Sequence, residues 1–560
     1  MTKFLPSVFF GHGNPMNAVT IQRCRMDSKF VSVEFRSAII AVVLVLASIA
    51  PLPVRAQAVS LDPAKMPRIT TVDEQFASYN IEMAEVTGGN FWKPYHSKTS
   101  AVTRATELAQ SASTPTGMNS NMYQYRPPID LSNPRLRKLA ESLGPAYVRV
   151  SGTWANSVYF ADSDNPPDKA PAGFNGVLTR KEWKGVIDFV HAVNGKLVTS
   201  FATSVGTRNA QGVWTPKEAD VWLAYTKSVG GQIAAAEFMN EPTYAVMGGA
   251  PKGYNAADYG RDIAVFRPWL KQNSPGTLFL GPGTVGEGPF PIAMAGMLHT
   301  EDLLRRTGPV FDVFSYHLYA AASKRCASMG EKAQTTAAAA FSEQWLSRPE
   351  KINEYYASLR NRFEPGKPLW ITETADAACG GNPWASTFLD TFRYLIEHAS
   401  LAQRGVKFIM HNTFASSDYG LLDPDTFEPR PNYWATLLWN KLMGTTVLNP
   451  KLSPPLHTYV YAQCLKGRPD GVALLVINAD RQREFALILP EAGERYTLSA
   501  MQLQATTVQL NGDTLQLNSN GDLPQPKGEP TQAGRVSFAP CTITFLAFAT
   551  AQNNACEKRE

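Results

Sequence analysis

The chain has 560 residues, which is more than one ordinary domain needs and enough for a barrel with a smaller module. With 44% hydrophobic and 18% charged residues, it belongs neither to the disordered nor to the fibrous class of protein. The formal charge of +5 is concentrated at the start, because residues 1–58 hold six Lys or Arg and only two Asp or Glu. The remaining residues carry a net charge of +1, which argues against nucleic acid as a partner.

The first residues have the pattern of an export signal. Ser37–Ala50 is an apolar run too short to span a membrane, Arg36 precedes it, and the small-residue motif Ala56-Gln57-Ala58 follows it. This order predicts a signal peptide within residues 1–58, cleaved near its end, and a protein exported to the periplasm or the medium without stable membrane insertion. A start at Met26 gives the leader a normal length, so we expect Met26 to be the true start.

An exported chain reaches an oxidising compartment, where cysteines pair. Five cysteines follow the predicted signal, so an odd one is left over; they are Cys326, Cys379, Cys464, Cys541 and Cys556. Because neither CxxC spacing nor a histidine cluster marks a metal site, we predict no metal and no cofactor.

Eight short apolar runs alternate with segments of helical periodicity in residues 59–444. The predicted strands are Ser78–Ile81, Tyr147–Val150, Lys196–Ala202, Ile233–Met239, Leu278–Gly281, Val313–Tyr316, Leu369–Thr372 and Lys407–His411. This alternation predicts an α/β fold, a (β/α)8 TIM barrel. A doubly wound sheet is the competing interpretation, but no glycine-rich phosphate loop follows the first strand.

Two helix starts are marked in the sequence. Thr179 and Glu182 form a capping-box pattern before Lys181–Val193, whose apolar residues share one face. A second helix is expected after Thr215-Pro216, with the threonine as N-cap and the proline in the first helical position.

Residues 445–560 have a different pattern of short alternating runs, such as Val472–Asn478, separated by turn signals at Asn511-Gly512 and Asn520-Gly521. We predict an antiparallel β-sandwich as the C-terminal domain. The residues directly after the leader are further candidates for this domain.

Two glutamates lie at or just after the predicted fourth and seventh strands, where the active-site mouth of a barrel should be. They are Glu241, in Asn240-Glu241-Pro242, and Glu373. Hydrolysis of a glycosidic bond needs such a pair, one carboxyl to protonate the leaving oxygen and one to act at the anomeric carbon. For either glutamate alone, a solvated surface position is a competing interpretation.

In these residues the chain resembles glycoside hydrolase family 79, the heparanase and β-glucuronidase family. The ordered motifs are SYNIEMAE, LAESLGPAYVRVSGTWANS, the Asn-Glu-Pro run, SYHLY and DYGLLDPDTFEPRPNYWATLLWNKLMG. The resemblance extends from about Ser78 to the C-terminus. It implies a retaining mechanism with Glu241 as acid/base and Glu373 as nucleophile.

The resemblance also implies a set of substrate-binding residues. Glu82 (an Asp in relatives) and Thr153 would contact the sugar, Asn240 its 2-hydroxyl, and Tyr319 would lie beside the nucleophile and orient it, while Cys379, Gly380, Gly381 and Tyr419 would surround a uronic acid carboxylate. Backbone N–H groups of a glycine-rich loop can bind such a carboxylate without formal charge. Relatives carry a tyrosine where this chain has Ala378 or Cys379, so the loop departs from the family pattern. His317 fits a wall residue as well as a ligand contact.

Two disulfides are expected. Cys464–Cys556 follows the spacing seen in the animal relatives, and Cys326–Cys379 would join loops that follow neighbouring strands of the barrel. Cys541 would then be the buried cysteine outside both bridges.

The leading hypothesis is a retaining endo-β-glucuronidase that cleaves β-linked glucuronic acid in heparan sulfate or a related glycosaminoglycan. The alternatives are an exo-β-glucuronidase that removes terminal residues and a carbohydrate-binding barrel without catalysis. The loop after the fifth strand lacks the basic residues of heparan-cleaving animal relatives, which leaves Lys181, Arg208, Lys324 and Arg325 as candidate cleft cations. We expect a glucuronic-acid-containing polysaccharide as partner, and a monomer.

Overall fold

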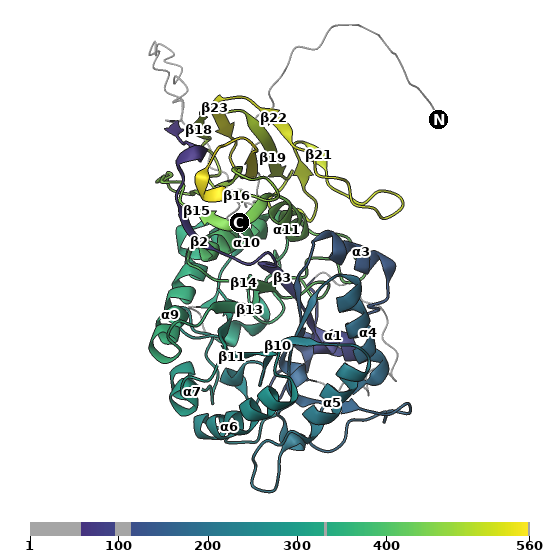
Figure 1. Cartoon of the computed structure of the whole chain (residues 1–560). Coiled ribbons are helices and arrows are strands. Elements are labelled where there is room, and N and C mark those ends of the chain that lie inside the picture. The colour runs from purple at the N-terminus through teal and green to yellow at the C-terminus, as the bar shows by residue number, and fades with distance from the viewer. Residues whose placement is uncertain (1–57, 96–113, 330–332, 558–560) are drawn as a thin grey trace, which may run out of the picture.

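The computed structural model describes residues 58–95, 114–329 and 333–557 (Figure 1). Residues 1–57, which hold all but the last residue of the predicted signal region, lie outside these ranges, as does the proposed start at Met26. Within the described residues, none of the helices combines the length and the apolar character needed to cross a bilayer.

The predicted (β/α)8 barrel is confirmed, because eight parallel strands close into one barrel. In barrel order they are β3 (Ala77–Glu82), β6 (Tyr147–Ser151), β9 (Lys196–Ser200), β10 (Ile233–Glu237), β11 (Leu278–Thr284), β12 (Val313–Tyr319), β13 (Leu369–Ala375) and β14 (Phe408–His411). No strand is out of sequence order, which excludes the doubly wound sheet.

Helices surround the barrel (Figure 1). They are α3 (Pro134–Ser142), α4 (Arg180–Ala192), α5 (Lys217–Ser228), α6 (Ala256–Asn273), α7 (Thr300–Thr307), α9 (Arg348–Phe363), α10 (Phe388–Gln403) and α11 (Pro431–Leu442), with the short α1 (Met83–Thr87) and α8 (Glu343–Leu346). Two short strand pairs lie outside the barrel sheet. β4 (Gly89–Trp92) pairs antiparallel with β5 (Tyr123–Arg126), and β7 (Val158–Ala161) pairs parallel with β8 (Gly176–Thr179).

One predicted helix start is confirmed and one is wrong. Thr179 and Glu182 form the expected reciprocal capping box at α4. At α5, however, Pro216 occupies the N-cap position. Thr215 does not cap the helix because both its N–H and its hydroxyl donate to the Thr207 carbonyl oxygen, each at 2.9 Å.

The strand ends differ from the predicted ones in a way that positions the site. β10 ends at Glu237, two residues early, because the Asn240 backbone bonds to the side chain of Asn156 instead of a neighbouring strand. β12 and β13 extend further than predicted, so that His317 and Glu373 lie opposite each other as register partners within paired strands.

The C-terminal region forms the predicted antiparallel β-sandwich. Its larger sheet contains β2 (Arg68–Thr71), β15 (Met443–Leu448), β16 (Thr458–Leu465), β17 (Val472–Asn478), β24 (Thr542–Phe548), β19 (Gly493–Ser499), β20 (Gln509–Leu510), β21 (Asp513–Thr514) and β22 (Glu529–Thr531). Its smaller sheet contains β1 (Val59–Ser60), β18 (Phe485–Leu489) and β23 (Gly534–Phe538). A separate apolar cluster fills the space between the two sheets. The predicted boundary between residues 444 and 445 stays a prediction.

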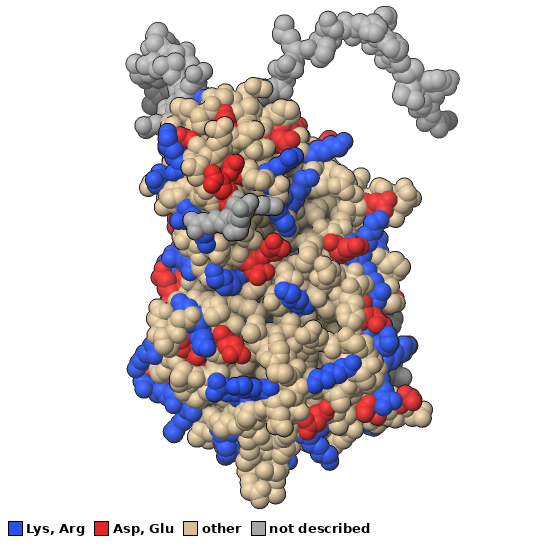
Figure 2. Space-filling view, viewed as in Figure 1, with Lys and Arg blue, Asp and Glu red and all other residues tan. Residues whose placement is uncertain are grey.

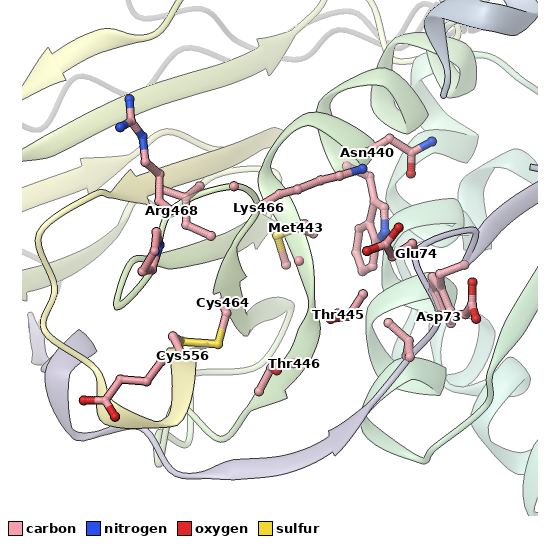
Figure 3. A pocket seen from close by; sticks show the side chains of 18 residues that line it. Asp73, Glu74, Asn440, Met443, Thr445, Thr446, Cys464, Lys466, Arg468 and Cys556 are labelled. Atoms are coloured by element: carbon pink, nitrogen blue, oxygen red, sulfur yellow. A yellow bond between two sulfur atoms is a disulfide. The ribbon is translucent and has the colours of Figure 1, made fainter. Parts of the chain in front are cut away.

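The barrel and the sandwich enclose a cavity of about 410 Å³ between them (Figure 3). Asp73 and Glu74, just before β3, lie on one side of it, and the Cys464–Cys556 disulfide lies on the other. This cavity is distant in the fold from the strand ends that carry the predicted catalytic residues, because it borders the segment that enters β3. On the face shown in Figure 2, basic and acidic side chains are interspersed and form no large patch of one sign.

Candidate active site

The two predicted catalytic carboxyls meet at the carboxyl end of the barrel. Oxygen atoms of Glu241 and Glu373 and a ring nitrogen of His317 all lie within 4.8 Å of one another. Both glutamates line one cavity, with the side chains of Glu241 and Glu373 12% and 7% exposed, respectively. Among the described residues, these three side chains also form the group that lies close enough together to share a metal ion. The hydrogen-bond distance between His317 and Glu241 accounts for their approach without a metal ion.

Glu373 is held at both carboxylate oxygens. The Tyr319 hydroxyl donates to Oε1 at 2.7 Å, and Arg149 Nη1 donates to Oε2 at 2.9 Å. Tyr319 therefore lies where the sequence analysis expects it. Two donors from different strands fix the direction of this carboxylate.

Arg149, in β6, is a residue that the sequence analysis missed. Its guanidinium is 1% exposed and also donates to Glu237 Oε2 at 2.8 Å and to Asn240 Oδ1 at 2.8 Å. Burial raises the pKa of Glu237, but the Arg149 charge and hydrogen bonds from Thr372 and Arg149 outweigh it and hold that pKa below 4.5. The buried Arg149–Glu237 ion pair thus holds the Arg149 guanidinium in place beside Glu373.

Glu241 has the opposite environment. Its backbone is in the left-handed region, with φ +46°, and no arginine contacts its carboxyl. Burial raises the pKa of Glu241 to about 7, and the nearby Arg149 charge limits that shift while Glu237 adds to it. A carboxyl with a pKa raised in this way can donate a proton near neutral pH, whereas Glu373 accepts a hydrogen bond at each of its two oxygens.

His317 connects the two carboxyls. Its Nδ1 lies 3.0 Å from Glu241 Oε1 and 3.7 Å from Glu373 Oε2. Burial is the largest influence and lowers the pKa of His317, so the ring is neutral near pH 7. Arg149 Nη2, which can only donate, lies 3.3 Å from Nε2, so the hydrogen-bond network places the ring proton on Nδ1, facing Glu241.

On the opposite side of the cavity, Glu82 is held close to Glu373. Its Oε1 accepts from Asn412 Nδ2 at 3.0 Å, while its buried Oε2 has no partner among the described residues. Burial, followed by the neighbouring Glu373 charge, raises the pKa of Glu82 well above its usual range. Gly152 makes room for this carboxyl, since a Cβ there would lie 1.5 Å from Glu82 Oε2.

Asn412 was also missed, and it connects several predicted residues. Its Nδ2 lies 3.1 Å from the Tyr319 hydroxyl and 3.2 Å from the Tyr419 hydroxyl, in addition to Glu82. Tyr419 and Thr153 line the cavity as the sequence analysis expects. Asn240 does not line it in this structure, and its side-chain oxygen is occupied by Arg149.

The predicted uronate loop lies at the cavity rim. Cys379 lines the cavity and is bridged to Cys326, the pairing expected from the sequence. Gly380 and Gly381 lie behind it, and all three residues have positive φ, between 63° and 84°. Glycine is required at 380 because a Cβ there would lie 2.5 Å from the Trp92 side chain.

The remaining walls are mainly apolar. Besides the residues named above, the described lining consists of Trp92, Pro115, Met118, Tyr123, Trp154, Tyr244, Met247, Val285, Ile292, Met329 and Ala378. Within this described lining there is no lysine or arginine. The proposed cleft cations are therefore misplaced: Arg208 pairs with Asp262, Arg325 pairs with Asp418, and Lys181 and Lys324 are exposed residues outside the cavity.

The signals for the missed residues differ. Arg149 is the single charged residue in the strand Tyr-Val-Arg-Val-Ser, and a lone charge in such a buried strand indicates a buried ion pair. Asn412 directly follows the eighth strand, at the same barrel end as the two glutamates. Glu237 lies inside the predicted fourth strand, and in the structure it is the last residue of β10.

The chain has sequence relatives along most of its length. It is 29% identical over 377 residues to heparanase-like protein 1 of Arabidopsis thaliana, covering 64% of this chain and 66% of that protein. It is 25% identical to baicalin-β-D-glucuronidase of Scutellaria baicalensis, covering 77% and 86%, respectively. These similarities confirm the resemblance to glycoside hydrolase family 79 that the sequence motifs predict.

The relatives also include one that is named as inactive: inactive heparanase-2 of Homo sapiens is 24% identical, covering 69% of this chain and 67% of that protein. No family model matches the chain. Among solved structures, a 4-O-α-L-rhamnosyl-β-D-glucuronidase from Fusarium oxysporum shares the fold, with a TM-score of 0.58 and 11% identity, covering 88% of this chain and all of that one.

Proposed function

We propose that the chain is a retaining β-glucuronidase, with Glu241 as acid/base and Glu373 as nucleophile. The observation that carries this proposal is the close approach of two carboxyls in opposite electrostatic environments, with oxygens within 4.8 Å. Retaining enzymes have carboxyls about 5–5.5 Å apart, whereas inverting enzymes need about 6.5–9.5 Å to admit a water. The short separation therefore favours attack by a carboxylate over attack by water.

The reaction follows from the hydrogen bonds. Glu373, oriented by Tyr319 and Arg149, attacks the anomeric carbon while the bond to the leaving oxygen breaks. Because His317 Nδ1–H occupies Oε1 of Glu241, the acidic proton is carried on Oε2 and passes to the leaving oxygen. Glu241 then takes a proton from water, whose oxygen releases the sugar from Glu373.

Recognition of glucuronic acid is assigned to the side of the cavity away from Glu241. We propose that the protonated Glu82, Asn412 and the Tyr419 hydroxyl bind sugar hydroxyls, and that the Cys379–Gly381 loop binds the carboxylate through backbone N–H groups. Thr153 contacts the sugar from the β6 side. Asn240 would need to release Arg149 to reach the 2-hydroxyl.

Two substrate classes remain candidates. Heparan sulfate or a related polymer is the substrate class suggested by the heparanase resemblance. The described walls near Glu241 favour the second class, small β-glucuronides with an apolar or aromatic leaving group, because they contain Met247, Ile292 and Tyr244 and no cation for a sulfate. A relative named for the glucuronide baicalin is in line with this second class.

Incubation with 4-nitrophenyl β-D-glucuronide and with heparan sulfate separates the hypotheses. Release of 4-nitrophenol supports the β-glucuronidase proposal, and retained configuration by NMR supports the double-displacement step. Oligosaccharides from the polymer identify endo action, whereas release from the small glycoside alone identifies exo action. No product from either substrate, together with sugar binding, identifies a binding protein.

We further propose that the protein acts after export, as the sequence of residues 1–58 predicts. The two disulfides support this proposal, since such bridges form in oxidising compartments. Sequencing the N-terminus of the protein recovered from culture medium or periplasm tests both cleavage near Ala58 and the compartment.

A further inference from the structure

Arg325 is a buried cation at the rim of the active site for which the proposed reaction has no direct use. It lies in the 3-10 helix Lys324–Met329 after β12, and its side chain is only 7% exposed. It does not line the cavity, so it is not placed to contact the sugar. It instead contacts three other rim segments, those that follow β4, β13 and β14.

The guanidinium is anchored on one side. It pairs with Asp418, which follows β14, and lies over the Tyr95 ring at 3.7 Å from the centroid. Tyr95 in turn donates its backbone N–H to Asp418 at 3.3 Å, and Arg325 Nε donates to the Lys93 carbonyl oxygen at 3.0 Å. These contacts fix the position and plane of the cation.

On its other side the guanidinium binds the predicted uronate loop by its carbonyl oxygens. Nη1 donates to Cys379 O at 3.1 Å and to Gly381 O at 2.9 Å. The Ser323 hydroxyl donates to Cys379 O as well, at 2.9 Å, and the Ser417 hydroxyl donates to Gly380 O at 3.0 Å. All three carbonyl groups of the loop are therefore engaged by the protein.

The planarity of the peptide bond converts these contacts into a direction for the N–H groups. In a trans peptide the C=O and the following N–H point in opposite directions, so holding Cys379 O on Arg325 turns the Gly380 N–H away from Arg325. In the described chain, that N–H donates to no protein acceptor. Cys379 lines the cavity, whereas Arg325 does not.

We infer that Arg325 is a positioning residue for uronate recognition. It binds the carbonyl oxygens of Cys379 and Gly381, and this orients the N–H groups of the loop, above all that of Gly380, toward the carboxylate of the sugar. The Cys326–Cys379 disulfide fixes the same loop covalently. This inference rests on the proposed function, because it concerns the same sugar site. In this arrangement the basic residue orients the loop, and neutral backbone N–H groups make the contact with the carboxylate.

The test compares substrates that differ only in the carboxylate. Arg325→Met and Arg325→Lys are assayed on 4-nitrophenyl β-D-glucuronide and 4-nitrophenyl β-D-glucoside, which share a leaving group. We expect kcat/KM for the glucuronide to fall about tenfold or more in Arg325→Met, mainly through KM, a change equivalent to one charge-assisted hydrogen bond. Arg325→Lys keeps the charge beside Asp418 but cannot bridge both carbonyl oxygens, so a smaller loss of the same kind is expected.

Arg208 provides a matched control elsewhere in the barrel. It is also buried, pairs with Asp262 at 2.7 Å, donates to the carbonyl oxygens of Thr203 and Gly212, and lies over the Tyr254 ring. Arg208→Lys should change thermal stability to a similar extent as Arg325→Lys without changing the preference for glucuronide over glucoside.

Calorimetric binding of D-glucuronate and D-glucose gives a readout that needs no turnover. Weaker glucuronate binding in the Arg325 variants, with unchanged glucose binding, supports the inference even if Arg325→Met is recovered poorly and only the lysine variant is measured. Equal losses for both sugars, or an unchanged preference in both variants, would overturn it. Failure of the wild-type protein to cleave the glucuronide overturns the proposed function instead, because the binding comparison remains interpretable.

Discussion

At the scale of single residues, the pKa of Glu241 should set the pH range of the proposed reaction. Burial raises that pKa to about 7, and the residue must be protonated to assist the leaving group. Activity on 4-nitrophenyl β-D-glucuronide, measured as kcat/KM, should therefore be maintained below about pH 7 and fall above it. A basic limb near pH 4.5, the ordinary value for a glutamic acid, would contradict an acid role for the buried carboxyl.

Replacement of each proposed catalytic glutamate by glutamine should have a distinct signature. Glu373→Gln removes the nucleophile but keeps the shape, so turnover should be abolished, by at least about 10³-fold, while glucuronate binding is retained. Wild-type rates in this variant would remove Glu373 from its role.

Glu241→Gln should have an effect that depends on the leaving group. Strongly acidic leaving groups need little protonation, so a dinitrophenyl glucuronide should still form the glycosyl-enzyme at a rate close to that of the wild type. Glucuronides with poorly acidic leaving groups should lose about 10²–10⁴-fold. The burst of released phenol measures this first step directly. Uniform loss over the whole series would count against proton donation.

The sequence predicted the two glutamates because strand ends in a barrel converge, and it predicted Tyr319 and Tyr419 through the family resemblance. It could not predict that Arg149 would bind Glu237 and Glu373 together, since this requires three strands to face one interior point. It also could not show that Arg325 lies behind the loop, because a basic residue in a loop has the same appearance whether it faces solvent or carbonyl oxygens.

At the scale of elements, the short α1 contains a buried carboxyl that should make stability depend on pH. Glu85 is 3% exposed and accepts from the Glu82 backbone N–H at 2.7 Å and from the Ser416 hydroxyl at 2.6 Å. Burial is the largest influence and raises the pKa of Glu85 to about 7. Between about pH 4.5 and 7 the unfolded chain loses this proton and the folded chain keeps it, so stability falls as pH rises through this window.

Glu85→Gln should remove that dependence, because glutamine resembles the protonated acid. Relative to the wild type, the variant should gain roughly 3 kcal/mol of unfolding free energy between pH 4 and pH 8. Urea unfolding at both values measures the difference. Glu141→Gln, at an exposed position of α3, serves as the control and should have the same effect at both values. A constant difference for Glu85→Gln would show that the carboxyl is ionised in the folded protein.

Strand boundaries show where sequence periodicity stops being informative. The periodic run predicts that the fourth strand continues to Met239, but the side chain of Asn156 takes over the backbone of Asn240 and the strand ends at Glu237. This early end allows the left-handed turn at Glu241 that brings its carboxyl toward His317. A contact between residues 84 positions apart is not contained in local periodicity.

At the scale of the whole molecule, the sandwich contains strands from both ends of the described chain. β1 pairs with β18 and β2 pairs with β15, so the first described residues are part of the C-terminal sheets. Asn553 strengthens this connection, since its side chain donates to the carbonyl oxygens of Pro63 and Met66. Removing the residues up to Thr71 should therefore destabilise the sandwich in addition to shortening the barrel's entry segment.

The Cys464–Cys556 disulfide links the C-terminal segment to the sandwich, beside the cavity between barrel and sandwich (Figure 3). It joins β16 to the C-terminal segment over a separation of 92 residues. In the entropy model, closing a loop of this length restricts the unfolded chain by about 4–5 kcal/mol. Cys464→Ala combined with Cys556→Ala should lower the free energy of unfolding by up to this amount, and by less if the unfolded chain is compact.

Urea unfolding under oxidising and reducing conditions measures the contribution of this bridge. The double variant should be less stable than the wild type without reductant, and reductant should narrow the gap, because only the wild type still has this bridge to lose. Cys541→Ala, which leaves both disulfides in place, controls for the loss of a buried sulfur. Hydrolysis of 4-nitrophenyl β-D-glucuronide at 25 °C should be unchanged in the double variant, since the bridge lies at the opposite end of the barrel from Glu373. Loss of activity in a variant that remains folded would contradict this expectation. It would mean that the sandwich affects the geometry of the active site as well as the stability of the protein.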